Sequence, residues 1–325
     1  MSDPDIQTHA SASDSGGIPL IVTAPDAATD SAAWFASQRD WIDDALLEHG
    51  ALLFRGFPMG TEQAFDMLAT ELFGERLAYV YRSTPRTSVG KNIYTTTEYP
   101  ADEHIPLHNE NAYQRDWPLR LAFCCLQAAA SGGQTPLADT GRVTLGLPEA
   151  LIDRFRERGV MYVRNYYDYL DLPWQTVFQT EDKAEMEAFC EARDIEVHWK
   201  PDGGLRTVQR AQALATHPRV GRELWFNQAH LFHVSALDAD TRSALTDLFP
   251  EEDLPRNAFY GDGTPISESD LSEIRGAFER EKVMFDWKAG DVLLLDNMLV
   301  SHGRAPFTGQ RRVLAALGEA CSSNA

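Results

Sequence analysis

The sequence predicts a mainly β fold, a barrel or jelly roll with flanking helices and helical insertions. Two observations support this prediction. Many short runs of β-branched and aromatic residues are bounded by Gly, Pro, Asp or Asn, which is typical of strands joined by turns. Before and between these runs, apolar residues recur at helix spacing, which predicts helices beside the strands.

The first predicted elements follow an N-terminal tail. Residues 1–17 are rich in Ser, Asp and Gly, and we expect them to be disordered. Apolar residues then recur at helix spacing over residues 34–45, and Gly50 offers a stop before a short buried strand at residues 51–54. A second amphipathic helix is predicted around residues 65–72, where it ends at a glycine.

The rest of the chain combines further helices with short strands. Helices are predicted at Pro148–Arg158, Asp182–Arg193, Ala236–Leu248 and Glu268–Glu281. Strands are predicted at Arg120–Gln127, Val160–Tyr166, Ile195–Trp199, Gln212–Thr216, Glu223–Asn227, Val283–Trp287, Val292–Leu295, Met298–His302 and Arg312–Leu317. Because no linker or repeat interrupts the chain after the tail, residues 18–325 are expected to form a single domain.

Charge and cysteine usage limit the partners and the compartment. The formal net charge of −20 repels phosphate backbones and anionic lipid, so we expect no nucleic-acid or membrane partner. It would attract a cationic or zwitterionic small molecule. The four cysteines form no CxxC pair and are expected to be reduced, and the N-terminus lacks the features of a secretory signal. Together these features predict a cytoplasmic protein.

Two histidines and one carboxylate are the candidate metal ligands. His108 and Glu110 lie two residues apart, which puts both side chains on one face of an extended strand, although this pattern alone is common by chance. His302 ends a predicted strand before Gly303, where it can reach into a barrel or be a core histidine bonded to the backbone. Two His and one carboxylate leave three positions of an octahedral Fe(II) open for O2 and a chelating co-substrate.

Arg312 and Thr135 are the candidate contacts for a keto-acid co-substrate. Such a molecule carries a distal carboxylate, which a planar guanidinium binds through two parallel hydrogen bonds. Strand alternation lets only one of Arg311 and Arg312 point inward, and both would be solvated on an edge strand. Thr135 follows a Ser-Gly-Gly turn and can donate its hydroxyl to the same carboxylate.

Four motifs between residues 107 and 314 carry a family resemblance. In order they read LHNENAYQRDWPLRLAFCC, GGQTPLAD, ATHPRVGRELWFN and GDVLLLDNMLVSHGRAPFTGQRRVL. They resemble the taurine dioxygenase / clavaminate synthase-like family of Fe(II)- and 2-oxoglutarate-dependent oxygenases. Within it, YTTTEYP, RNAFYGDGTPI and HGRAPFTG are most similar to the syringomycin-cluster aspartate hydroxylase group, which acts in peptide natural-product pathways.

The resemblance implies a double-stranded β-helix that uses Fe(II), 2-oxoglutarate and O2. It makes His108, Glu110 and His302 the iron ligands, and Thr135 and Arg312 the contacts of the 2-oxoglutarate carboxylate. The implied activity is hydroxylation, or a related oxidation, of an sp3 C–H bond of an amino acid or a derivative. The implied setting is natural-product (antibiotic) biosynthesis.

Two departures from the family pattern refine this expectation. Glu110 stands where taurine-type members have Asp, as in clavaminate synthase-like members. Halogenating relatives have a small residue there, so hydroxylation or desaturation is favoured over halogenation. Ala316 stands four residues after Arg312, where taurine-type members carry the arginine that binds the sulfonate, so a sulfonate substrate is not expected.

The substrate contacts follow from charge alone. Glu98 can pair with an amine or guanidinium, and Arg82 and Arg164 can pair with a carboxylate, although each can also be a scaffold ion pair. The expected substrate is a small amino-acid-like molecule, free or tethered to a carrier protein. Both a monomer and a homo-oligomer remain open.

Two other functions are alternatives to an oxygenase. A zinc hydrolase can use the same donor set, but the sequence has no HExxH motif and this function leaves Arg312 and Thr135 without a role. A catalytically inactive jelly-roll binding protein is the second alternative. The intact ligand set argues against it.

Overall fold

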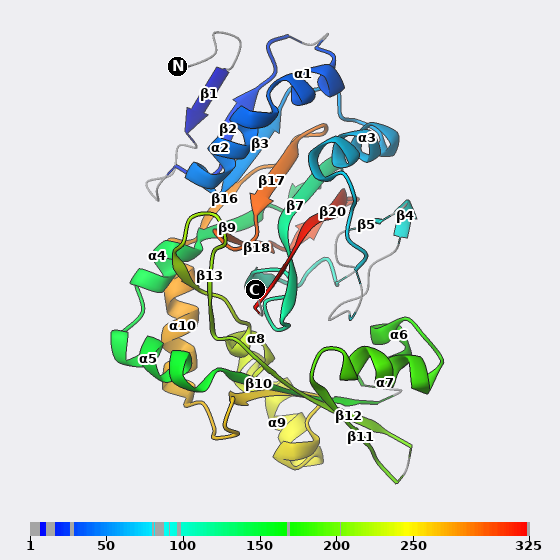
Figure 1. Ribbon diagram of the computed structural model, residues 1–325, viewed down its shortest axis with the longest axis vertical. Coiled ribbons are helices and arrows are strands. Elements are labelled where there is room, and N and C mark those ends of the chain that lie inside the picture. The colour runs from blue at the N-terminus through cyan, green and yellow to red at the C-terminus, as the bar shows by residue number, and fades with distance from the viewer. Residues whose placement is uncertain are drawn as a thin grey trace.

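Two packed β-sheets, a third sheet and surrounding helices make up the computed structural model (Figure 1). The structure describes residues 7–10, 17–26, 29–79, 81, 88–90, 92–95, 99–167, 170–201 and 203–323.

The larger sheet has eight strands and includes strands from both ends of the chain. Its strands are, in spatial order, β1 (Gln7–Ala10), β2 (Leu20–Thr23), β3 (Ala51–Arg55), β17 (Val292–Asp296), β7 (Asp116–Gln127), β20 (Arg312–Ser322), β5 (Ile93–Thr95) and β4 (Ser88–Gly90). Only β2 and β3 pair in parallel; the other described neighbours are antiparallel. The central strands β17, β7 and β20 come from distant parts of the chain.

A smaller, four-stranded antiparallel sheet carries two of the candidate metal ligands. In spatial order its strands are β16 (Val283–Phe285), β9 (Thr135–Asp139), β18 (Val300–Arg304) and β6 (Ile105–His108). His302 on β18 and His108 on β6 are register partners. The two histidines are therefore neighbours because their strands pair.

Side-chain alternation buries both faces of the larger sheet. In β17, Leu293 and Leu295 belong to the apolar cluster shared with the smaller sheet, and Val292 and Leu294 belong to the cluster shared with the N-terminal helices. All four side chains are completely buried. The inner face of the larger sheet thus packs on the smaller sheet, and its outer face is covered by helices. These helices are α1 (Ser31–Ser37), α2 (Arg39–His49) and α3 (Glu62–Phe73).

A third sheet and the remaining helices enclose a separate apolar cluster on the other side of the smaller sheet. The strands of the third sheet are, in spatial order, β11 (Ile195–Trp199), β12 (Leu205–Ala211), β10 (Val160–Tyr166) and β15 (Arg256–Tyr260). The helices are α4 (Thr140–Leu145), α5 (Glu149–Arg158), α6 (Trp174–Phe178), α7 (Lys183–Glu191), α8 (Ala229–Phe232), α9 (Ala239–Leu248) and α10 (Glu268–Glu281), with short 3-10 turns η1 (Val234–Ala236) and η2 (Glu251–Asp253). Two short strand pairs are β13 (Leu214–Thr216) with β14 (Glu223–Trp225), and β8 (Ser131–Gly132) with β19 (Phe307–Thr308).

The predicted mainly β architecture with flanking helices is confirmed. The predicted helix at Glu268–Glu281 and the predicted strand at Val160–Tyr166 have the observed bounds of α10 and β10. Strand β12 was missed, because its buried residues include Thr207 and Gln209, which hide the apolar alternation of a strand.

The prediction of a disordered tail over residues 1–17 is wrong for Gln7–Ala10, which form β1. This strand pairs antiparallel with β2 at the edge of the larger sheet. Pairing satisfies backbone groups of a segment whose composition alone suggests disorder. Residues 1–6 and 11–16 lie outside the described residues.

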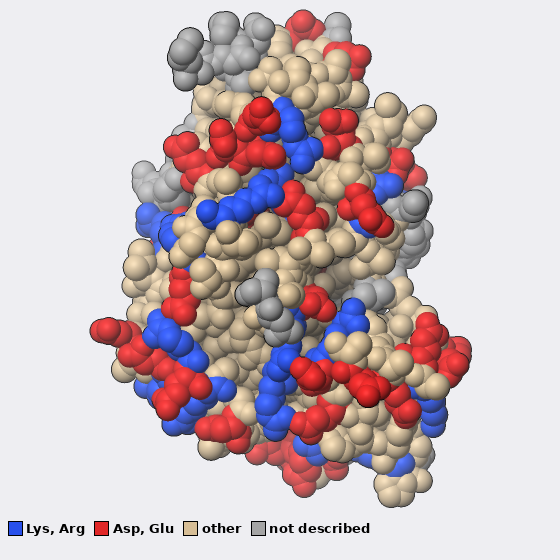
Figure 2. Space-filling view, in the orientation of Figure 1, with Lys and Arg blue, Asp and Glu red and all other residues tan. Residues whose placement is uncertain are grey.

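The charged surface is mixed. On the face drawn in Figure 2, basic side chains lie next to acidic ones over most of the molecule. Pairs such as Arg156 with Glu223 and Arg154 with Asp270 are partly exposed, and pairs of this kind contribute about 0–1 kcal/mol each. Within the described residues, every helix is too short or too polar to cross a lipid bilayer.

Gly50 joins α2 to β3 in a conformation that needs glycine. Its φ is 70°, and a Cβ there would lie 2.6 Å from Cγ2 of Val300 at the start of β18. We predict that Gly50→Ala lowers the free energy of unfolding by about 1–3 kcal/mol, measured by denaturant unfolding, because alanine is strained at this φ and crowds β18. Gly60→Ala is the control, since its Cβ would meet no atom within 4 Å. An equal loss in both variants would contradict this account.

Candidate metal centre

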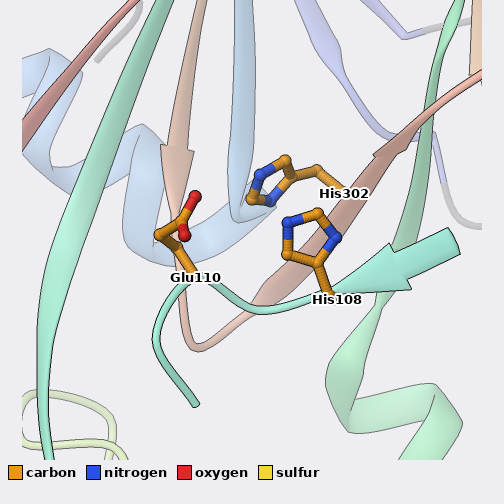
Figure 3. A group of neighbouring side chains, drawn as sticks. All are labelled: His108, Glu110 and His302. Carbon is orange, nitrogen blue, oxygen red and sulfur yellow. The ribbon is translucent and has the colours of Figure 1, made fainter. Parts of the chain in front are cut away.

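The structure brings the three predicted metal ligands together. One ligand atom from each of His108, Glu110 and His302 lies within 4.8 Å of the other two. Figure 3 shows the three side chains around a common centre, with the histidines on adjacent strands and Glu110 in the loop after β6. Two imidazoles and one carboxylate in this arrangement fit a divalent metal ion.

Pairing of β18 with β6 sets the positions of the two histidines. The ring centroids of His108 and His302 are 4.5 Å apart. The register shifts between His302 and Arg304, and a Cβ on the intervening Gly303 would lie only 2.5 Å from the Ile105 carbonyl oxygen. Strand β18 continues through Gly303 to Arg304, whereas the sequence predicted that the strand ends at His302. The absence of a side chain on Gly303 lets β6 approach β18 closely.

Glu110 was predicted to lie on the same strand as His108, but its backbone is held by the side chain of Asn297. Strand β6 ends at His108, so Glu110 does not continue it. Instead the Asn297 amide pairs with the Glu110 backbone: Glu110 N donates to Oδ1 at 2.7 Å, and Nδ2 donates to Glu110 O at 2.9 Å. The Tyr79 hydroxyl donates to Oε1 of the Glu110 carboxylate at 3.1 Å. Contacts of this kind orient a metal ligand and fix which oxygen faces the ion.

Hydrogen bonding prepares His108 for a metal. Its Nδ1 lies 2.8 Å from the Pro106 carbonyl oxygen, which can only accept, so Nδ1 carries the proton and Nε2 keeps its lone pair. Burial, together with the neighbouring Tyr79, raises the pKa of Tyr113, so this nearby phenol stays neutral. His108 can therefore offer the lone pair of Nε2 to a cation without a change of tautomer.

The prediction that Arg312 points inward is wrong. Its side chain is half exposed and pairs with Glu62 on α3, on the outer face of the larger sheet. Arg311 points to the opposite face, where its Nε donates to the Gly133 carbonyl oxygen at 3.1 Å. Burial lowers the pKa of Arg311 to about 10, so the guanidinium stays charged at neutral pH.

Alternation along β20 explains the difference. Val313 and Ala315 belong to the apolar cluster between the sheets, and Leu314 and Ala316 to the cluster under the N-terminal helices. Because alternate residues share a face, Arg311 lies on the inner face with Val313. The pairing of β20 with β7 is also irregular between Arg312 and Val313. The predicted register was off by one residue.

Thr135, the other predicted contact of the co-substrate, is the first residue of β9 in the smaller sheet. Its strand, β9, begins two residues after Gly133, which Arg311 contacts, and its side chain is buried. The indole Nε1 of Trp287 donates to the Thr135 hydroxyl oxygen at 2.9 Å. An oxygen that accepts from Trp287 keeps its own proton for another acceptor, which is the role predicted for Thr135.

A cavity of about 790 Å³ opens beside His108 and Glu110. Among the described residues that line it, Arg256 is the only lysine or arginine, and it forms an ion pair with Asp171. Burial alone would raise the pKa of Asp171, but the Arg256 guanidinium holds it below its usual value. Much of the remaining wall is apolar, from Leu170, Leu172, Leu231, Phe232, Val234 and Leu254.

The three predicted substrate residues have different outcomes. Arg82 and Glu98 lie outside the described residues. Arg164 is 2% exposed and is not among the residues that line the cavity; its guanidinium lies over the rings of Tyr81 and Tyr166, at 5.5 and 5.1 Å from their centroids. Its register partner on the neighbouring strand β15 is Arg256, which lines the cavity and was not predicted.

A mainly β fold in which two histidines and a carboxylate converge beside a cavity is typical of one class of mononuclear metal enzymes, the non-haem iron oxygenases. The family model described as "Taurine catabolism dioxygenase TauD, TfdA family" matches residues 21–317. The chain belongs to this family, which confirms the predicted enzyme class, an iron- and 2-oxoglutarate-dependent dioxygenase.

Two relatives illustrate this membership, and one solved structure shares the fold. The dapdiamide synthesis protein DdaC of Enterobacter agglomerans is 45% identical over 276 residues, 85% of this chain and 84% of the relative. A clavaminate synthase-like protein of Arabidopsis thaliana is 33% identical over 294 residues, 86% of this chain and 85% of that protein. The structure of PvcB from Pseudomonas aeruginosa, an Fe, alpha-ketoglutarate dependent oxygenase, has a TM-score of 0.56 at 15% identity and covers 98% and 92% of the two chains.

Tyr79 was not predicted, since it lies 31 residues from Glu110 and outside the recognised motifs. We predict that Tyr79→Phe weakens Mn(II) binding roughly 10-fold, because the Glu110 carboxylate loses a hydrogen bond that orients it. Calorimetric titration of the metal-free protein measures the affinity. Tyr113→Phe is the control, since its hydroxyl donates to the Tyr81 carbonyl oxygen instead. Equal affinities of the two variants would contradict the assignment.

Proposed function

We propose that this dioxygenase hydroxylates an sp3 C–H bond of an amino acid or an amino-acid derivative in natural-product biosynthesis. The convergence of His108, Glu110 and His302, with His108 and Glu110 lining the cavity, is the observation on which this proposal depends. The similarity to a dapdiamide synthesis protein supports the biosynthetic setting. Because Glu110 fills the carboxylate position, hydroxylation is favoured over halogenation.

The three side chains hold Fe(II), and the two packed sheets form a double-stranded β-helix around it, within one domain from residue 18 onward. When bound, iron supplies the activation of O2, with 2-oxoglutarate as the electron donor that leaves as succinate and CO2. Arg311, and not Arg312, binds the distal carboxylate of 2-oxoglutarate, and Thr135 donates its hydroxyl to the same group. The partly desolvated guanidinium of Arg311 supports this role, since such a cation gains more from an anionic partner than one in water does.

The cavity supports a substrate with both charged and apolar parts. Arg256 can bind a carboxylate and Asp171 an ammonium group, which together match an amino-acid-like molecule. These two side chains are 25% and 21% exposed, so they are accessible from the cavity but partly shielded from water. A volume of about 790 Å³ exceeds the needs of a free amino acid and leaves room for an extended derivative, including a carrier-tethered one. Cytoplasmic location stays a prediction from the sequence, which is compatible with both a monomer and a homo-oligomer.

The two arginines of β20 give a matched test of the co-substrate site. We predict that Arg311→Gln raises the KM for 2-oxoglutarate roughly 10- to 100-fold, since a hydrogen bond to a charged group contributes about 1.5–3 kcal/mol. Arg312→Gln should leave this KM unchanged, because its side chain faces α3. Succinate release at varied 2-oxoglutarate concentration measures both. A defect in the Arg312 variant alone would overturn the assignment to Arg311.

A substrate panel tests the proposed function itself. We predict that at least one amino acid, free or as a carrier-bound thioester, increases succinate release by the enzyme with Fe(II) and 2-oxoglutarate. Arg256→Gln should raise the KM for this compound and leave the KM for 2-oxoglutarate unchanged. Arg242→Gln is the control, because Arg242 lies on α9 in an exposed pair with Glu268. No stimulation by any member of the panel would contradict the proposed substrate class.

A further inference from the structure

A chain of buried side chains connects the metal ligands to the hairpin formed by β13 and β14. Asp296 ends β17 and Asn297 begins the turn to β18; these residues are 1% and 0% exposed. His217, in the hairpin between β13 and β14, is also completely buried. Its Nε2 lies 2.8 Å from Oδ2 of Asp296. His217 falls in the motif ATHPRVGRELWFN, to which the function described so far assigns no role.

Backbone hydrogen bonds determine which nitrogen of His217 carries the proton. The amides of Arg219 and Val220 lie 3.1 and 3.2 Å from Nδ1. Amide N–H groups only donate, so Nδ1 accepts and has no proton of its own. The ring proton is therefore on Nε2 and is donated to the Asp296 carboxylate. This bond fixes the orientation of a carboxylate that is closed off from water.

Asp296 in turn fixes the backbone of the turn. Its Oδ1 accepts from the amides of Met298 and Leu299, both at 3.0 Å. Strand β18 begins at the next residue and carries His302. The His217–Asp296 pair therefore controls how the chain enters the strand that holds one histidine ligand.

Asn297 links the same turn to the carboxylate ligand. Besides its two hydrogen bonds to the Glu110 backbone, its Nδ2 donates to the Pro118 carbonyl oxygen at 2.8 Å. Its own carbonyl oxygen accepts from Asn109 Nδ2 at 2.6 Å, between the two ligands of the first motif. One turn thus contacts the segment with His108 and Glu110 and precedes the strand with His302.

We propose that His217, Asp296 and Asn297 are positioning residues that set the distance between Glu110 and His302 for the metal ion. The inference rests on the metal site proposed above. A purely structural role would stabilise the fold and leave the metal affinity of the folded protein unchanged. A positioning role makes metal affinity depend on the hydrogen bond from His217 to Asp296, because a displaced ligand binds the ion in poorer geometry.

Two isosteric substitutions at His217 separate these roles. The amide oxygen of His217→Asn can take the place of Nδ1 and accept from Arg219 and Val220, but the side chain is too short to reach Asp296. The amide nitrogen of His217→Gln can take the place of Nε2 and donate to Asp296. We expect His217→Asn to weaken Mn(II) binding by the metal-free protein about 10-fold or more, and His217→Gln to restore most of the affinity. Thermal unfolding of the metal-free variants gives their fold stability.

The outcomes are distinct. Weaker Mn(II) binding by His217→Asn, with the affinity restored in His217→Gln, supports the proposal. Wild-type affinity in a folded His217→Asn, or an equal loss in both variants, overturns it. If His217→Asn does not fold, the Asn297→Asp variant tests the proposal instead. This variant keeps the oxygen that accepts from Glu110 N but loses the hydrogen bonds from Nδ2 to the carbonyl oxygens of Glu110 and Pro118. Unchanged Mn(II) affinity of Asn297→Asp overturns the proposal. Absence of Mn(II) binding by the wild-type protein would instead refute the metal site itself.

Discussion

The pairing of β18 with β6 is the constraint on which the rest of the site depends. It places His302 opposite His108, although the two residues are far apart in the chain. Gly303 makes this approach possible because any side chain there would meet the β6 backbone. The third ligand comes from no strand at all: Glu110 is held by the Asn297 amide, which substitutes for a strand neighbour. The metal site is therefore formed by one strand pair and one side chain that extends it.

The alternation of side chains that buries the core also places the two adjacent arginines, Arg311 and Arg312, on opposite faces of the larger sheet. Arg311 lies on the inner face, in contact with the Gly133 backbone, and Arg312 lies on the helix-covered face with Glu62. The protein has a formal net charge of −20, yet Arg311 is partly buried on the inner face and Arg256 lines the cavity. In the proposed function each of them binds an anionic group, Arg311 on the co-substrate and Arg256 on the substrate. The negative surface then favours substrates that also carry a positive charge.

Local patterns in the sequence predicted what depends on neighbouring residues, such as α10 and β10, and the separated motifs indicated the three side chains that converge at the candidate metal centre. They did not resolve Arg311 from Arg312, because residues 313–317 are apolar on both faces of β20 and give no sign of which face is inner. Tyr79 and Asn297 were missed because they meet Glu110 across 31 and 187 residues of chain. The periodicity of apolar residues in the sequence gives no information about contacts between residues so far apart in the chain. The same applies to Arg256, whose strand was not predicted and whose cavity is built from several separate segments.

The central claim is that His108, Glu110 and His302 bind one metal ion with room for a chelating keto acid beside Arg311. Anaerobic titration of the protein with Fe(II) and 2-oxoglutarate, followed by visible absorption, tests it most directly. The account predicts a weak charge-transfer band that saturates at one iron per chain and requires both components. Its absence in the wild-type protein, or its persistence at full strength after Glu110→Ala and His302→Ala substitution, would contradict the account.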